Sequence, residues 1–303
     1  MSAPDSSLIP PSGGAGGVLP LDKPTGPSSH DCVAGVRRVL GIRQVGHAGT
    51  LDPFASGLLL VCFGPATRLA PYLTPLRKTY LARMRLGEAT DTDDLTGQSI
   101  SRSDGWIAIT DAEIAAALAT QTGLLHQIPP LYSAKKVAGE RMYAAARRGE
   151  TVERTPSAVT VHRLELRAVR LPEVEFEVEC SSGTYIRAIA RDVGDALGVG
   201  GHLRALRRTR IGGYAVEAAV PLDALPDGVR LREAILSPSE AVAHLPRLRV
   251  DAKGARAIRY GRAVPAMEHG FAEGPIALVS EEGTLLAIGT AREGEVHPRK
   301  VFA

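Results

Sequence analysis

The spacing of apolar residues along the chain predicts three helices. Two of them begin with a capping signal, a Ser or Thr followed three residues later by an acid, at Ser28 and at Thr110. The first helix should end at Gly41, because glycine readily adopts the left-handed conformation that closes a helix. The apolar positions of the three helices are Val33, Val36 and Leu40; Ile114 and Leu118; and Ile186, Ile189, Val193 and Leu197.

Other segments predict strands. Leu58–Phe63 is a continuous apolar run between two glycines and should be a strand buried on both faces, and Thr79–Leu86 reads as another strand. In residues 173–180 glutamates alternate with apolar residues, which predicts a half-buried strand with an acidic, solvated face. The Gly-rich segment Val45–Gly57 reads as a loop.

Because strands and helices are interspersed without a regular βαβ rhythm, we expect a mixed α/β (α+β) fold, a mixed sheet with flanking helices. The 303 residues allow two domains. We assign 1–17 to a disordered tail and 18–245 to the main domain, with Leu236–Pro246 as a linker. Residues 247–303 contain short β-like runs, which predict a small β-barrel-like module. These runs are Ile276–Val279, Thr284–Ile288 and Val301–Phe302.

Positive charge is unevenly distributed. The net charge is +3, yet Leu124–Arg170 holds nine Lys or Arg against four Glu, a net of +5, which leaves −2 for the remainder. Clustered positive charge indicates a phosphate-rich partner. Genome composition is an alternative source of the arginines, since 30 of the 36 basic residues are Arg and the chain has no Asn.

Several classes of protein are disfavoured. The longest apolar run, Leu58–Phe63, is far shorter than the ~20 residues of a membrane span. The three cysteines have no metal-ligand or disulfide-framework spacing, and we expect a cytoplasmic protein. No phosphate-binding loop, dinucleotide fingerprint, zinc-protease helix or serine-hydrolase elbow occurs, so we expect no nucleotide, flavin or metal cofactor.

The most conspicuous chemical motif is the loop from Gly46 to Pro53. It places Asp52 among glycines, directly before the predicted buried strand, and Pro53 restricts the conformation of that carboxylate. Loops held by a rigid sheet often carry catalytic groups. The alternative is an ordinary turn, since Asp-Pro commonly begins one.

Three further segments are candidates. Tyr185 and Arg187 lie where a strand passes through a glycine turn into a helix, a place suited to stacking a base and pairing an anion. Lys78-Thr79-Tyr80 begins a strand, and His202–Arg210 holds four arginines that could contact phosphates. Taken singly, each segment has a structural alternative. Tyr185 and Tyr80 would then be aromatic residues at the edge of the core, and Arg187 and the arginine run would be solvated.

Together these motifs resemble the TruB family of tRNA pseudouridine synthases. The resemblance runs from about Gly17 to Gly213 in consistent order. It comprises Leu-Asp-Lys-Pro-x-Gly-x-Ser-Ser from Leu21, Gly-His-x-Gly-Thr-Leu-Asp-Pro from Gly46, Lys-x-Tyr from Lys78, Gly-Thr-Tyr-Ile-Arg from Gly183, and Leu-Arg-Arg from Leu206. The C-terminal segment resembles the shortened PUA-type RNA-binding module of bacterial members. Ala48 departs from the family's frequent Thr, and the spacing of His47 and Asp52 is intact.

The resemblance implies roles for individual residues. Asp52 corresponds to the catalytic nucleophile, and Arg187 to the arginine that pairs with it. Tyr80 corresponds to the tyrosine that stacks on the target base and is linked to proton removal at C5. His47 corresponds to the histidine that inserts into the T loop. Tyr185 and Leu206 match the walls of the base pocket.

The resemblance also implies a substrate, uridine 55 in the T arm of tRNA, and a basic insertion at about 124–151 that contacts RNA. No cofactor, guide RNA, membrane or obligate protein partner is expected. Three alternatives stay open: a guide-RNA-dependent synthase, a non-catalytic RNA chaperone and a nucleoside hydrolase. The residues expected to contact the RNA backbone are Lys135, Lys136, Arg141, Arg147, Arg148, Arg204 and Arg208.

Overall fold

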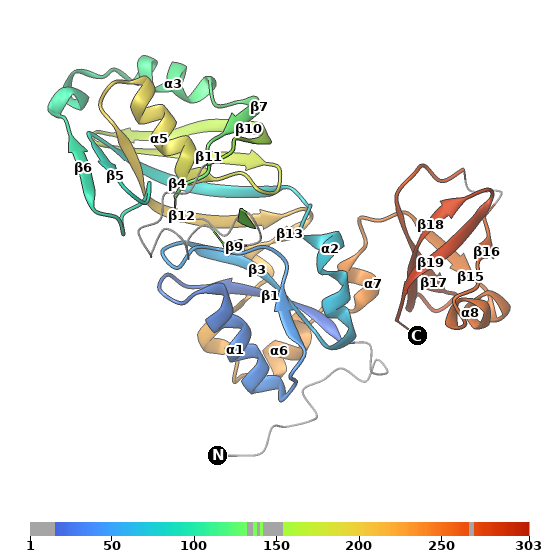
Figure 1. Ribbon diagram of the computed structural model, residues 1–303. Helices are drawn as coiled ribbons and strands as arrows, with labels where there is room; N and C mark the ends of the chain where they lie inside the picture. The colour runs from blue at the N-terminus through green and yellow to red at the C-terminus, as the bar shows by residue number, and fades with distance from the viewer. Residues whose placement is uncertain (1–15, 132–135, 138–139, 142–153, 267–269, 303) are drawn as a thin grey trace. The chain divides into compact units, whose positions relative to one another are not determined.

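A computed structural model describes residues 16–131, 136, 137, 140, 141, 154–266 and 270–302 (Figure 1). It divides into two compact units, and each is described by itself. Unit 1 comprises Met1–Asp52, Leu58–Pro75 and Gly213–Ala303; unit 2 comprises Pro53–Gly57 and Leu76–Gly212. Both mix helices with sheet, so the predicted fold class is confirmed. No helix in the described part of the chain is long and apolar enough to cross a membrane.

In unit 1 the strands follow the order β14-β1-β3, with β2 antiparallel to β3. Helix α1 begins with the predicted capping box at Ser28 and ends at Gly41, whose φ is +65°. Its apolar face packs with β1 and β3 in one core. The first elements of this unit are β1 (Gly17–Lys23), α1 (Ser29–Leu40), β2 (Val45–His47), β3 (Ser56–Phe63), the 3-10 helix η2 (Gly64–Leu69) and α2 (Ala70–Leu73).

The prediction of a loop over Val45–Gly57 is wrong at both ends. Val45–His47 forms β2, and β3 begins at Ser56. The cause is tertiary: β2 pairs with the end of β3, so that Val45 lies opposite Phe63, and this pairing overrides the local preference of a Gly-rich sequence. The strand predicted at Leu58–Phe63 is confirmed, since every residue of that run is buried.

The prediction that Leu236–Pro246 is a linker is also wrong. This segment contains the helix α7 (Pro238–Ala241), capped by Ser237, and buries Ala241 and Val242. The main chain of Leu236 exchanges two hydrogen bonds with Val18 of β1, at 2.9 and 3.0 Å. The other elements before the C-terminal module are β13 (Tyr214–Ala215), η4 (Val216–Ala218), β14 (Val220–Pro221), η5 (Leu222–Ala224) and α6 (Gly228–Ala234).

Residues 247–266 and 270–302 form a five-stranded open sheet with its own apolar core. The strand order is β15-β17-β18-β19-β16, and helix α8 packs against the sheet. The three predicted β-runs fall on β17, β18 and β19, whereas the sequence analysis missed the other elements. The bounds are β15 (Arg247–Val250), α8 (Ala252–Arg259), β16 (Val264–Pro265), β17 (Pro275–Ser280), β18 (Leu285–Arg292) and β19 (Glu295–Val301).

Unit 2 is built on a sheet in the order β3-β12-β4-β11-β10-β7, to which β3 contributes Ser56 and Gly57. Helix α5 packs on β12 and β4, and α3 packs on β10 (Figure 1). The elements are β4 (Lys78–Leu86), β5 (Glu88–Thr90), β6 (Ser99–Arg102), η3 (Asp104–Ala108), α3 (Asp111–Ala119), β7 (Gly123–Gln127), β8 (Lys136–Val137), β9 (Glu140–Arg141), β10 (Ser157–Arg170), β11 (Glu173–Cys180), α5 (Ile186–Ala196) and β12 (Gly201–Ile211).

Strand β11 confirms the predicted alternation, because its apolar residues are buried and its glutamates are half-exposed. The acidic face is also ion-paired by arginines of the neighbouring strands. Glu173 pairs with Arg83 at 3.1 Å, and Glu177 pairs with Arg167 at 3.1 Å. The helices predicted at Thr110 and after Gly183 are confirmed as α3 and α5.

The run His202–Arg210 is a strand inside the sheet of unit 2, β12. Arg204 and Arg210 are exposed, whereas Arg208 is only 1% exposed. The burial of Arg208 disagrees with the predicted contact of this residue with the RNA backbone, whereas the contact predicted for the exposed Arg204 stays a prediction.

Two predictions fall partly or wholly on residues outside the described part of the chain. Residues 1–15 of the predicted tail lie outside it, and Gly17 is the first residue of β1. In the insertion, Lys135, Arg147 and Arg148 lie outside it. Lys136 of β8 and Arg141 of β9 lie opposite each other in the backbone register of these two antiparallel strands.

Gly57 is a position that only glycine fits. Its φ is +105°, and a Cβ there would lie 2.2 Å from the carbonyl oxygen of Arg208. We predict that Gly57→Ala lowers the free energy of unfolding by about 2–3 kcal/mol. Gly213→Ala, where a Cβ meets nothing within 4 Å, is the matched control. Urea unfolding measures both, and equal stability of the two variants would contradict this account of Gly57.

Candidate active site

The Asp52 loop of unit 1 is held through the residue before the carboxylate. Ser29, buried near the start of α1, accepts a hydrogen bond from the Leu51 N–H at 2.9 Å, and its hydroxyl donates to the Leu51 carbonyl at 3.0 Å. Leu51 is buried and Asp52 half-buried. The N–H of Ala48 donates to Leu60 of β3, and Gly49 turns the chain at φ +106°. The loop therefore presents Asp52 on a fixed backbone.

His47 lies in the same loop, at the end of β2. Its ring packs edge-on against that of His30 in α1, with centroids 5.7 Å apart. Both side chains are accessible, since His47 is half-buried and His30 exposed.

A buried lysine in unit 1 was missed by the sequence analysis. Lys23, at the end of β1, is fully buried, and its ammonium donates to the carbonyls of Pro24 at 2.9 Å and Pro27 at 2.7 Å. The sequence contains one indication of this burial, because Lys23 ends an apolar segment within the first motif of the resemblance.

In unit 2 the site residues share the buried face of the sheet. Tyr80 of β4 lies directly opposite Arg208 of β12, and Leu206 lies opposite Ala82, two residues further along the same face. Residues directly opposite on antiparallel strands have Cβ atoms about 4.5–5.5 Å apart. The structure therefore brings Tyr80, Leu206 and Arg208 together, with Tyr80 and Leu206 each 8% exposed.

Lys78 lies on this face as well, two residues before Tyr80. It is buried, and its ammonium donates to the Leu76 carbonyl at 2.7 Å. Burial, and secondly the positive charge of Arg208, lower the pKa of Lys78 to about 8. This face of the sheet thus carries two buried basic groups, Lys78 and Arg208.

Tyr185 and Arg187 lie at the start of α5. Tyr185 is the residue before the helix, and its main chain exchanges hydrogen bonds with the Gln127 amide, at 3.0 and 3.3 Å. Arg187 is buried and donates to the carbonyl of Thr92 at 2.9 Å. Its guanidinium also lies 3.4 Å from a carboxylate oxygen of Asp94.

Asp94 is itself held by three donors to its other oxygen. These are the Thr92 hydroxyl at 2.8 Å, the Thr96 hydroxyl at 2.6 Å and the Thr96 N–H at 2.9 Å. The sequence analysis missed Asp94, because the run Asp91–Asp94 reads as a solvated turn. Asp52 belongs to unit 1 and Arg187 to unit 2, so the pairing of these two stays a prediction.

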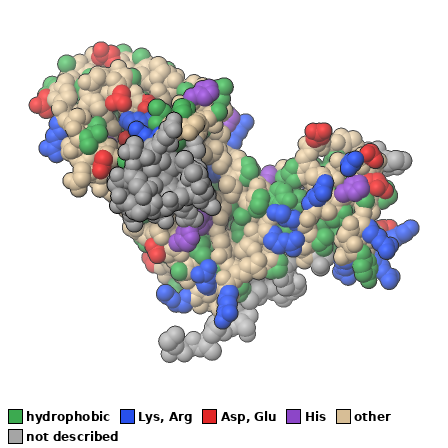
Figure 2. Space-filling view, in the orientation of Figure 1, with side chains coloured by type: hydrophobic (Ala, Val, Ile, Leu, Met, Phe, Trp, Pro, Cys, Tyr) green, Lys and Arg blue, Asp and Glu red, His purple; other side chains and the backbone are tan. Residues whose placement is uncertain are grey.

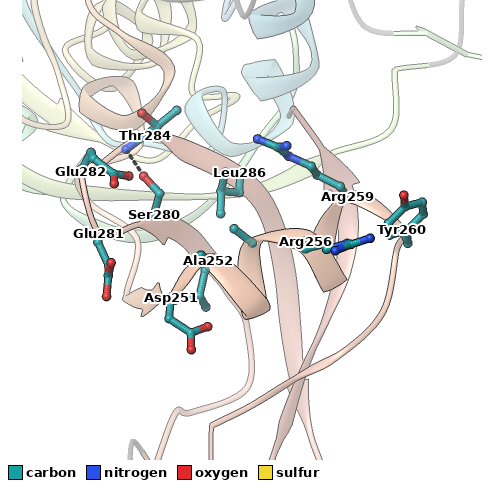
Figure 3. A pocket seen from close by; sticks show the side chains of 12 residues that line it. Asp251, Ala252, Arg256, Arg259, Tyr260, Ser280, Glu281, Glu282, Thr284 and Leu286 are labelled. Atoms are coloured by element: carbon teal, nitrogen blue, oxygen red, sulfur yellow. Dashed lines mark hydrogen bonds between the residues drawn. The ribbon is translucent and has the colours of Figure 1, made fainter.

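The C-terminal module has a groove of about 720 Å³ between α8 and the β17–β18 turn (Figure 3). Arg256, Arg259 and the exposed Tyr260 line one side, and Glu281 and Glu282 line the other. In Figure 2 Lys and Arg side chains gather over the part of the module that carries α8. None of the predicted catalytic residues lines this groove.

Comparison with known proteins identifies the family. The model of the TruB family pseudouridylate synthase N-terminal domain matches residues 37–186, and that of the tRNA pseudouridylate synthase B C-terminal domain matches 187–248. The chain belongs to the TruB family of pseudouridylate synthases, which are isomerases.

Curated relatives match nearly the whole chain. It is 45% identical to tRNA pseudouridine synthase B of Thermobifida fusca, over 95% of this chain and 99% of the relative. It is 43% identical to the enzyme of the same name from Burkholderia lata, over 94% and 89%.

Solved structures share the fold. One, the structure of an H/ACA RNP bound to a substrate RNA containing 2′-deoxyuridine, has a TM-score of 0.75 and 27% identity over 96% of this chain and 86% of that one. Another, an archaeal box H/ACA sRNP Nop10–Cbf5 complex, has a TM-score of 0.72 and 28% identity over 95% and 86%.

The lowered pKa of Lys78 predicts how the free energy of unfolding depends on pH. Between about pH 8 and 10.5 the unfolded chain keeps a proton on this lysine that the folded chain has lost, so the free energy of unfolding rises with pH there. Lys78→Met should flatten this rise, and Lys253→Met, at an exposed lysine, should not. Urea unfolding across this window measures it; parallel curves for wild type and Lys78→Met would contradict the prediction.

Proposed function

We propose that the chain converts uridine 55 in the T-arm loop of tRNA to pseudouridine. The observation that carries this proposal is the similarity, over nearly its whole length, to relatives named tRNA pseudouridine synthase B. The partner is then the T stem-loop of tRNA, and the place of action the cytoplasm.

The proposed reaction breaks the N1–C1′ bond of uridine and joins C1′ to C5 of the same base. The hydrogen at C5 is lost and N1 gains one, so that all atoms balance without a cofactor. Asp52 is the proposed nucleophile, attacking either C1′, as in retaining glycosidases, or the base. Arg187 would keep Asp52 ionised, because a neighbouring cation favours the charged form of a carboxyl group.

The target uridine must leave the stack of the folded loop to reach this carboxylate. The cost of unstacking is offset in the pocket by stacking on an aromatic ring, the role proposed for Tyr80. Leu206, beside Tyr80 on the sheet, and Tyr185 would complete the walls, and His47 would enter the space in the T loop.

We propose residues 18–245 as the catalytic domain and 247–303 as a PUA-like RNA-binding module. In the module the basic side of the groove, Arg256 and Arg259 with Tyr260, offers charge for a phosphate and a ring for a base. The exposed Arg204 is proposed to contact RNA backbone together with the basic insertion. Arg208 is withdrawn from that group, because it is buried.

A guide-RNA-dependent synthase is the second candidate, since the chain shares its fold with proteins of H/ACA particles. The curated relatives, at 43–45% identity, favour action on tRNA without a guide. One experiment separates these candidates.

The experiment incubates the purified chain with unmodified tRNA and maps pseudouridine by carbodiimide treatment and primer extension. We expect a single new stop at position 55 without added protein or guide RNA. Asp52→Asn should abolish the stop and leave tRNA affinity nearly unchanged, because Asn keeps the shape and lacks the anionic nucleophile. A stop elsewhere would overturn the specificity, and a requirement for guide RNA would favour the second candidate. Conversion by Asp52→Asn at a comparable rate would overturn the assignment of the nucleophile.

A salt titration tests the RNA-contact surfaces. Replacing Lys135, Lys136, Arg147 and Arg148 by Ala, or Arg256 and Arg259 by Ala, should reduce the slope of log K against log salt. The reduction should be about 0.7–0.9 for each phosphate that the variant no longer binds. The control replaces Arg83 and Arg102, which pair with glutamates on the surface, by Ala. A variant whose line runs parallel to that of the wild type removes its surface from the RNA interface.

A further inference from the structure

The loop between β5 and β6 holds two adjacent buried aspartates, and each pairs with an arginine of α5. Asp94 faces Arg187 at 3.4 Å, and Asp93 faces Arg191 at 2.9 Å. The two arginines are four residues apart and therefore lie on one face of the helix. Only the first of these pairs contains a residue that the family resemblance implicates.

Asp93 is held in an unusual conformation. Its φ is +59°, a left-handed value that an aspartate adopts at some cost. The N–H of Leu203 in β12 donates to the Asp93 carbonyl at 3.1 Å. Burial raises the pKa of Asp93, while Arg191, Arg187 and Arg154 oppose that rise. The pairing with Arg191 therefore offsets part of the cost of burying the charged form of Asp93.

Among the described residues of unit 2, Arg191 has three partners, on three segments. Its guanidinium contacts Asp93, donates to the carbonyl of Ile128 at 3.1 Å, and pairs with Asp192 at 2.8 Å. Ile128 directly follows β7 and lies near the start of the predicted insertion at about 124–151. Arg154, whose charge acts on Asp93, lies on the C-terminal flank of the same insertion. The pair is thus hydrogen-bonded to the chain near the start of the insertion.

Two partners of Arg187 lie on either side of Asp93 in the sequence. They are the carbonyl of Thr92 and the carboxylate of Asp94. The backbone at Asp93 joins these two partners, so its conformation helps to set where the guanidinium of Arg187 lies. The Arg191 side chain is 18% exposed, so direct contact with RNA is the rival role for it.

We propose that Asp93 and Arg191 are positioning residues, which fix the Thr92–Asp94 segment so that Arg187 is held in the orientation that pseudouridine formation requires. This inference rests on the proposed function. The pair touches no reacting atom, and it acts on the chemical step through Arg187. A buried ion pair adds little to stability compared with apolar packing, so stability alone is a weak reason for the pair.

The test compares Asp93→Asn with the matched control Asp192→Asn. Each removes one carboxylate that pairs with Arg191, and Asn tolerates the left-handed conformation at 93 as well as Asp does. We expect Asp93→Asn to lower the single-turnover rate on unmodified tRNA by about tenfold to a hundredfold, because small displacements of a catalytic group have effects of this size. The Kd for tRNA should stay within about twofold of the wild-type value, because the pair binds no phosphate in this role. Asp192→Asn should match the wild type in both.

A double-mutant cycle shows whether the effect passes through Arg187. In an Arg187→Lys background, Asp93→Asn should lower the rate no further, since the two changes disturb one interaction. If Asp93→Asn does not fold, as judged by circular dichroism, Arg191→Lys replaces it, with the same expectation for rate and Kd.

Three results would overturn the proposal. They are an unchanged rate in Asp93→Asn, a loss of affinity that accounts for the loss of rate, and independent effects of the 93 and 187 substitutions. A wild-type chain that forms no pseudouridine in tRNA would overturn the proposed function, and this inference with it. An active wild type with an equally active Asp93→Asn would reject the inference alone.

Discussion

The buried guanidinium of Arg187 is the constraint on which much of unit 2 depends. An unpaired cation at 4% exposure would be strongly destabilising, so the fold must supply negative charge and carbonyl oxygens beside it. Asp94 and the Thr92 carbonyl do so, and Asp94 is fixed in turn by Thr96. The left-handed turn at Asp93 and its pairing with Arg191 complete the same network.

Other buried basic residues also need negative charge or carbonyl oxygens beside them. Lys23 in unit 1 and Lys78 in unit 2 are buried, and each ammonium is satisfied by main-chain carbonyls. Arg208, on the inner strand β12, lies opposite Tyr80 of β4. Such groups cost free energy to bury, so their retention is informative about function. In the proposed reaction, Arg187 is the cation that would favour an ionised Asp52.

Local sequence patterns predicted much of the fold, because they reflect single elements. The capping box of α1, the alternation of β11 and the apolar run of β3 each follow from side chains within one segment. The patterns failed where distant segments decide the structure. Val45–His47 becomes a strand through pairing with β3, residues 236–246 fold against β1, and the arginine-rich run 204–210 enters the sheet.

The same distinction between local and distant signals applies to the site residues. The family resemblance pointed to Asp52, Tyr80 and Arg187 because their motifs are contiguous. The sequence did not predict a role for Asp93, Asp94 or Arg191, because a run of aspartates in a turn resembles a solvated loop. One signal was present: Arg187 and Arg191 interrupt the apolar spacing of the α5 helix at i and i+4. Read together with an acidic turn upstream, such a pair indicates a buried ionic network.

The role proposed for the buried Arg187 is in the chemical step rather than in RNA binding or stability. Arg187→Lys tests it most directly, because lysine keeps the charge but loses the planar fork that contacts Thr92 and Asp94 together. We predict a folded variant with an unchanged Kd for tRNA and a single-turnover rate reduced about a hundredfold or more. A rate equal to that of the wild type, or a loss of activity explained entirely by weaker tRNA binding, would contradict the account.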